Sequence, residues 1–353
     1  ILSGTNVPDV VRLASFGNLV KDKLLTNLDP YASAYGWTKW PQSQFDSTRL
    51  EANGTQRGSG SLYGVGPGFG LTGVFYNKTL AAQIGMTKAP TSLAGFEKLM
   101  AKAKAAGILP MVENGKDGGT GFILQNLQMD YAGSTAPVQK WNYDVKGATI
   151  DSPATVQAAT TLQQWAEDGY FSPDVNAVDQ TLAPTQFISG KGLFFASGNW
   201  QAPGIDQAAS GQFGFFLFPP KNSGGKYSAM TSADTLAIPS KARHQAAAAA
   251  FLDFIQTNAV ARQDTVKLGG IVPAGPIGAS TPSTTAGSVV GATVKSFGTL
   301  LKSDGLVDFM ANATASINVN AIVPQTQLLV AGKTTPQSFS TALQTEYTRE
   351  LAQ

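Results

Sequence analysis

One stretch, residues 61–78, constrains the fold of this chain more than any other. It reads S-L-Y-G-V-G-P-G-F-G-L-T-G-V-F-Y-N-K, so that glycines and a proline lead into an apolar, β-prone run. Glycine and proline at this density mark turns and close backbone approaches, and the run after them is typical of a buried strand. A short helix is expected from Thr79. The stretch therefore predicts a passage of the chain from one domain to another.

Length and charge limit what the chain can do. At 353 residues it is long enough for two domains, because a single core seldom grows beyond about 250–300 residues. Charged residues make up only 14%, the net charge is +2, and no basic block occurs. Nucleic-acid binding needs clustered lysine and arginine. The sequence therefore does not predict a nucleic-acid partner.

Reactive side chains are scarce. The chain has no cysteine, which excludes disulfides, thiolate catalysis and cysteine metal sites. Its one histidine, His244, precedes an alanine run and is expected to lie at a solvated helix start. The sequence has no run of about 18 apolar residues, so it does not predict a membrane-spanning helix. We therefore expect no metal and no cofactor.

Strands and helices are expected to alternate along the chain, which indicates an α/β fold. The expected strands include 71–76, 108–112, 193–196, 213–218 and 227–238. The expected helices include 93–106, 122–131, 153–168, 245–256 and 336–351. We find no internal repeat.

The order of these signals resembles that of the family 1 extracellular solute-binding proteins, the sugar receptors of ABC importers. The pieces that match are 4–11 (GTNVPDVV), 25–31 (LTNLDPY), 62–65 (LYGV), 74–78 (VFYNK), 90–96 (PTSLAGF), 187–191 (FISGK), 198–200 (GNW), 249–254 (AAFLDF) and 332–339 (GKTTPQSF). None is specific alone, but nine in the right order span the chain. The family normally has about one more βα-βα unit before the P-D-V-V segment, so we expect an N-terminal part to be missing here.

The resemblance implies a two-lobe fold of the type II periplasmic binding proteins, with the ligand in a cleft between lobes joined by crossing strands. Lobe one is then expected to comprise 1–76 plus 235–300, and lobe two 77–230 plus 301–353. The crossings are expected near 74–78 and 227–238.

The resemblance also implies a saccharide ligand, whose C–H faces need aromatic platforms and whose hydroxyls need short polar side chains. Trp200, at a position where the family commonly has tryptophan, is the first candidate platform. The other candidates for the ligand site are Phe69, Ser15, Phe16, Phe122, Asn199, Ser232 and Trp141. For the aromatic candidates the alternative is packing in the core.

Asp234 departs from the family, whose second crossing usually carries small residues. Its carboxylate is expected either to accept bonds from sugar hydroxyls or to cap a turn at the hinge; a third possibility is pairing with a cationic ligand such as an amino sugar. Glycoside hydrolysis would need two carboxylates. Glu113, Asp117 and Asp234 are candidates without a recognised spacing, so we do not expect an enzyme.

The predicted function is capture of a neutral mono- or oligosaccharide by lobe closure and delivery to the permease subunits of an ABC transporter. A monomer outside the cytoplasm is expected, periplasmic or lipid-anchored at the outer face of the cell membrane. The alternatives are a binding protein for a peptide, a polyamine or an amino sugar and, more remotely, a carbohydrate-active enzyme.

Overall fold

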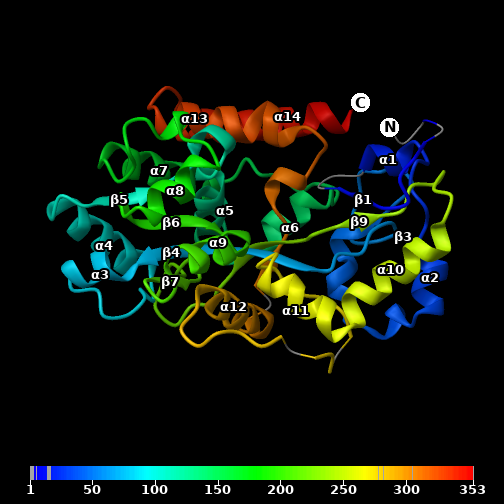
Figure 1. Ribbon diagram of the computed structural model, residues 1–353. Coiled ribbons are helices and arrows are strands. Elements are labelled where there is room, and N and C mark those ends of the chain that lie inside the picture. The colour runs from blue at the N-terminus through cyan, green and yellow to red at the C-terminus, as the bar shows by residue number, and fades with distance from the viewer. Residues whose placement is uncertain are drawn as a thin grey trace.

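The computed structural model describes residues 4, 6–13, 17–276, 278–280, 282–303 and 305–352. These residues form two masses, a large one around a mixed sheet and a smaller one that holds the first helices of the chain (Figure 1). We call them the large lobe and the small lobe. Their buried side chains form separate hydrophobic clusters.

The large lobe is built on a mixed sheet. Its strand order is β11 (Leu306–Val307), β8 (Ala229–Ala233), β4 (Gly68–Asn77), β6 (Gly192–Gly198) and β5 (Leu109–Val112), and β7 (Phe213–Phe216) and β10 (Val272–Pro273) also pair with β4. β4 pairs antiparallel with β6 and β8, whereas β5–β6 and β8–β11 are parallel. The apolar run of residues 71–76 is thus a central strand, and its expected burial is confirmed.

Helices cover both faces of this sheet (Figure 1). They are α3 (Lys78–Gln83), α4 (Leu93–Ala105), α5 (Thr120–Ala132), α6 (Ala136–Asn142), α7 (Pro153–Glu167), α8 (Leu182–Ile188), α9 (Ala202–Ala209), α12 (Val289–Ser303), α13 (Val323–Val330) and α14 (Pro336–Leu351). Ser92 caps α4 and Ser152 caps α7 by accepting bonds from backbone N–H groups three residues on. Both caps lie where the sequence predicts helix starts.

The small lobe consists of short elements around its own core. They are β1 (Val11–Arg12), α1 (Gly17–Lys21), α2 (Asp29–Ala34), β2 (Arg49–Leu50), β3 (Ser61–Leu62), β9 (Leu236–Ala237), α10 (Gln245–Thr257) and α11 (Ala259–Lys267). Trp37 and Trp40 are buried in this core, where Trp37 donates its indole N–H to Asp253 Oδ1 at 2.9 Å. His244 begins α10 and bonds Asp9, a structural role as expected. Within the described residues, no helix combines the length and the apolar character that membrane crossing requires.

The chain crosses between the lobes at a different place from the one expected. Val65 and Leu236 exchange backbone hydrogen bonds of 3.0 and 3.1 Å in the small lobe. Phe69 already pairs with Ala233 in the sheet of the large lobe. Residues 74–77 lie deep in that sheet, paired with β6 and β7. The first crossing therefore lies near 66–68 and not at 74–78, because β4 extends further toward the small lobe than its apolar run indicates.

Helix α12 also departs from the expected division. The sequence analysis puts 235–300 in lobe one, but Val289, Phe297 and Leu300 of α12 belong to a hydrophobic cluster of the large lobe, with Phe213 and Phe215 of β7. Asp206 of α9 caps this helix by accepting the N–H groups of Val289 and Val290 at 2.8 and 3.0 Å.

Gly68 at the crossing gives a stability prediction. A Cβ at this position would lie 2.3 Å from the carbonyl oxygen of Val272, so that Gly68→Ala has to push β10 away from β4. We expect thermal melting to show a loss of about 1–3 kcal/mol. Gly298→Ala in α12 is the matched control, since its Cβ would meet nothing within 4 Å and alanine favours a helix. Equal melting temperatures of wild type and Gly68→Ala would contradict the prediction.

Candidate ligand-binding cleft

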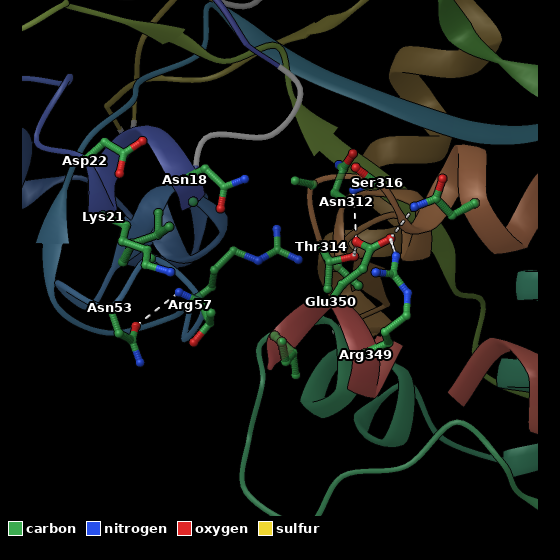
Figure 2. A pocket seen from close by; sticks show the side chains of 18 residues that line it. Asn18, Lys21, Asp22, Asn53, Arg57, Asn312, Thr314, Ser316, Arg349 and Glu350 are labelled. Carbon is green, nitrogen blue, oxygen red and sulfur yellow. Dashed lines mark hydrogen bonds and ion pairs between the residues drawn. The ribbon is translucent and has the colours of Figure 1, made fainter. Parts of the chain in front are cut away.

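A cavity of about 400 Å³ lies between the two lobes. Figure 2 shows Asn18, Lys21, Asp22, Asn53 and Arg57 of the small lobe on one side. On the other side are Asn312, Thr314, Ser316, Arg349 and Glu350 of the large lobe. Most of these side chains end in amide, hydroxyl or charged groups, and both signs of charge are present. The walls of this cleft thus come from both lobes.

Glu350 organises the wall on the large lobe. Its carboxylate accepts bonds from the backbone N–H of Ser316 at 3.0 Å, from the Nδ2 of Asn320 at 3.0 Å and from the hydroxyl of Thr314. The neighbouring Arg349 is half exposed and donates from Nε to Glu346 at 2.8 Å. This hydrogen bond lowers the pKa of Glu346 to about 2. The bonds that the carboxylate of Glu350 accepts from Thr314 and Ser316 thus hold the loop at 312–316.

Three aromatic side chains of the large lobe form a patch. Trp200 follows β6 and keeps 39% of its surface exposed. Its ring packs edge-on against Phe122 of α5, with centroids 6.0 Å apart, and lies 6.3 Å from the ring of Phe309. Phe122 and Phe309 contact each other at 5.7 Å. The turn after Phe309 carries Asn312, which lines the cavity, whereas the three rings themselves are not part of its lining.

Two glycines make room for the indole of Trp200. A Cβ on Gly198 would lie 2.0 Å from the ring, and a Cβ on Gly70 would lie 3.4 Å from it. Gly198 lies in β6 and Gly70 in β4, and these two strands pair side by side. The absence of a side chain at both positions leaves the space that the ring occupies.

Asp234 lies at the second crossing and has a partner within the chain. Its carboxylate accepts a bond from the Nε of Arg12, and its backbone N–H donates to the carbonyl of Gly68 at 3.0 Å. The side chain of Arg12 is 76% exposed, that of Asp234 26%. The neighbouring Ser232 is half-buried and donates its hydroxyl to the carbonyl of Ala233. Of the three expectations for Asp234, this geometry favours the hinge.

Phe69 does not occupy the expected position. Glycines on both sides of Phe69 predict a turn with an exposed ring, but residue 69 is in β4 and the half-buried ring stacks on Phe297 of α12 at 5.7 Å. The expectation failed because the partner ring lies in a helix more than 220 residues further on.

Trp141 and Asn199 are also structural. The ring of Trp141 is fully buried and stacks on Tyr347 at 4.3 Å. Asn199 is fully buried, and its amide bonds the N–H of Leu71 and the carbonyl of Phe69, fixing β6 to β4. Neither side chain is accessible to a ligand. Ser15 and Phe16, the remaining candidates, lie outside the described residues.

The carboxylates considered for catalysis do not form a pair. Glu113 is fully buried and accepts the N–H of Ala196 at 2.7 Å. Asp117 is exposed and accepts the N–H of Gln180 at 2.7 Å. Asp234 bonds Arg12. Each of the three has its own partner, and Glu113 is shielded from solvent.

Comparison with known proteins gives the family. The sequence model of the bacterial extracellular solute-binding proteins matches residues 1–262, most of the chain. The chain belongs to this family. No curated protein matches the sequence. The family consists of binding proteins found outside the cytoplasm.

Solved structures share the fold of this solute-binding protein. A chitin oligosaccharide binding protein is 19% identical with a TM-score of 0.82, covering 100% of this chain and 86% of that chain. The solute-binding protein RafE in complex with raffinose is 17% identical with a TM-score of 0.75, covering 98% and 86%. The galacto-N-biose/lacto-N-biose I-binding protein of *Bifidobacterium longum* is 18% identical with a TM-score of 0.75, covering 98% and 82%. At such identities the similarity shows the fold alone, which is the two-lobe, type II fold of periplasmic binding proteins.

Sequence reasoning missed three residues: Phe309 of the aromatic patch, Arg12 at the hinge and Arg57 of the cavity wall. Phe309 follows a two-residue strand and has no local signal of exposure. Arg12 shares its neighbourhood with Asp234 only through the pairing of β1 with β9. Arg57 lies in a polar hairpin that carries no motif, yet its side chain reaches the large lobe. The glycine-rich hairpin sequence was the one available signal for Arg57.

Proposed function

We propose that this solute-binding protein captures a neutral oligosaccharide between its lobes and delivers it to an ABC transporter permease. The observation that carries the proposal is the patch of Trp200, Phe122 and Phe309 in a protein whose two lobes also enclose a polar cavity. Trp200 is more than one-third exposed although it sits between two strands and two aromatic rings. A ring held in that way offers an apolar face to a ligand.

The combination suits the chemistry of a sugar. A pyranose presents C–H bonds on its faces and hydroxyls around its rim, so an aromatic face next to amide and hydroxyl groups fits both. Asn18, Asn53 and Asn312 supply such groups in the cavity. A volume of about 400 Å³ lies within the range of small-molecule sites, and is ample for more than one sugar ring.

The charges of the cleft argue against a cationic solute. Asp234, the carboxylate considered for an amino sugar or polyamine, already pairs with Arg12. Glu350 is occupied by three donors from its own lobe. Neither of these carboxylates is free to recognise a ligand amine, and the other charged side chains of the cavity wall are one acidic residue, Asp22, and three basic ones, Lys21, Arg57 and Arg349.

The relatives support the same class. The proteins of similar fold include a chitin oligosaccharide binding protein, RafE in complex with raffinose, and a lacto-N-biose I-binding protein. The last of these is the binding protein of an ABC transporter. A ligand favours the closed form only through its higher affinity for that form. The closed protein would then present the outer surface of both lobes to the permease.

A fluorescence titration tests the proposal. We expect the intrinsic tryptophan emission to change in a saturable way with at least one of chitobiose, xylotriose, raffinose, lacto-N-biose or galactose, because Trp200 is exposed whereas the other four tryptophans are buried. Spermidine and a tripeptide serve as controls of the other solute classes. A saturable response to a control and to none of the sugars would overturn the saccharide proposal.

A further inference from the structure

A hairpin of the small lobe reaches across the cleft to the large lobe. The hairpin, residues 51–60, connects β2 to β3. It is stiffened by Asn53, whose Oδ1 accepts the N–H groups of Thr55 and Gln56 at 3.1 and 3.3 Å. At its far strand, the backbone N–H of Arg57 donates to the carbonyl of Tyr143 at 3.2 Å. Tyr143 ends helix α6 of the large lobe.

The side chain of Arg57 makes further contacts with the large lobe. Its Nη1 bonds Asp308 Oδ2 in an ion pair, and its Nη2 and Nε donate to the carbonyl of Asn142 at 2.6 and 3.2 Å. Its guanidinium lies 5.1 Å from the ring centre of Tyr143. The side chains of Arg57 and Asp308 are only 9% and 3% exposed. Of the ion pairs found among the described residues, this one is the most deeply buried, and it joins the two lobes.

Asp308 is itself fixed within the large lobe. Its Oδ1 accepts the N–H of Phe309 at 2.8 Å and the Nδ2 of Asn312 at 3.0 Å. Its carbonyl accepts the side-chain amides of Gln125 and Asn142 at 2.8 and 2.6 Å. The carboxylate that meets Arg57 thus also holds Phe309 of the aromatic patch and Asn312 of the cavity wall.

We propose that Arg57 is a positioning residue for solute capture: its ion pair with Asp308 holds the lobes closed and couples their closure to the position of Phe309. The inference rests on the two-lobe fold and does not depend on which solute binds. A lobe rotation that opens the cleft separates Arg57 from Asp308 and Asn142, so the contact exists only in closed arrangements. A contact of that kind shifts the open–closed equilibrium toward the closed state before any ligand is present.

The absence of cysteine allows a direct test. Ser33→Cys on α2 and Thr348→Cys on α14 place one exposed thiol on each lobe. Spin labels on this pair report the distance between the lobes by pulsed electron–electron double resonance in the protein without sugar. We expect Arg57→Ala to raise the ratio of long to short distances about tenfold, within the range of typical coupling between sites. Arg57→Lys should restore part of the short-distance population.

Arg49→Ala is the matched control, because Arg49 pairs with Asp29 at 3.0 Å within the small lobe. Asp308→Asn, which keeps acceptors for Phe309 and Asn312, completes a double-mutant cycle and serves in place of Arg57→Ala if that variant does not fold. In the Asp308→Asn background, Arg57→Ala should add little. The proposal is overturned if Arg57→Ala leaves the distances unchanged, if Arg49→Ala shifts them equally, or if the effect persists undiminished without the Asp308 charge.

Discussion

Trp200→Ala is expected to weaken sugar binding by at least about 30-fold, the effect of removing an aromatic hot spot. The indole is the exposed member of the aromatic patch, and the rings of Phe122 and Phe309 that remain face the space it leaves. Isothermal calorimetry with the sugar found by the fluorescence panel measures the change. Because the ring is already 39% exposed, the melting temperature should change little.

Two further variants sharpen this test. Tyr35→Ala removes a ring with the same exposed fraction, which stacks on Trp37 in the small lobe, and should leave affinity unchanged. Gly198→Ala keeps the tryptophan but puts a Cβ 2.0 Å from its ring, so it should displace the indole and weaken binding too. Unchanged affinity in Trp200→Ala would remove this residue from the site.

Local sequence signals were sufficient for most of the fold. The caps at Ser92 and Ser152 and the apolar spacing of α4 predicted helices where they occur, because helix starts and faces are set by residues close in sequence. The predicted crossing at 74–78 and the predicted place of residues 289–300 in lobe one were wrong, since both depend on pairing with distant segments. β10 reaches β4 from about 200 residues further along the chain.

The exposure of an aromatic candidate was hard to predict from sequence, because it depends on partners that are distant along the chain. Trp200 was a candidate because of its position in the family, and the structure brings Phe122 to the same patch. Trp141 and Phe69 looked equally available in sequence, but Tyr347 and Phe297 cover them from distant helices. Burial of an aromatic ring by a remote partner leaves no trace in the residues around that ring.

Glu113→Gln is expected to stabilise the folded protein at neutral pH by about 1–3 kcal/mol, the cost of a buried polar group without a partner. Glu113 Oε1 accepts the N–H of Ala196, but Oε2 is buried without a hydrogen bond, as is the Oδ1 of Asn114. Both unpartnered oxygens lie within 3.1 Å of the point where a Cβ of Gly119 would be, so they are close to each other. A glutamine keeps the acceptor and turns N–H donors toward Asn114.

The gain should depend on pH in a defined direction. Burial raises the pKa of Glu113 well above its ordinary value of 4.5, although the N–H groups of Ala196 and Asn114 oppose this shift. A carboxyl with a raised folded-state pKa contributes stability below its unfolded pKa and loses that contribution as pH rises toward the folded value. The advantage of Glu113→Gln in thermal melting should therefore be present at pH 7–8, shrink as the pH falls toward about 4.5 and be lost below that pH.

Asp117→Asn is the matched control for this variant, because Asp117 lies four residues away, is exposed and keeps its partner Gln180 N–H as an asparagine. It should show no gain at neutral pH. A Glu113→Gln variant that is less stable than wild type at neutral pH, with a loss that fades as the pH falls below about 4.5, would show that the carboxyl is held ionised by partners in the folded protein, and would contradict the prediction.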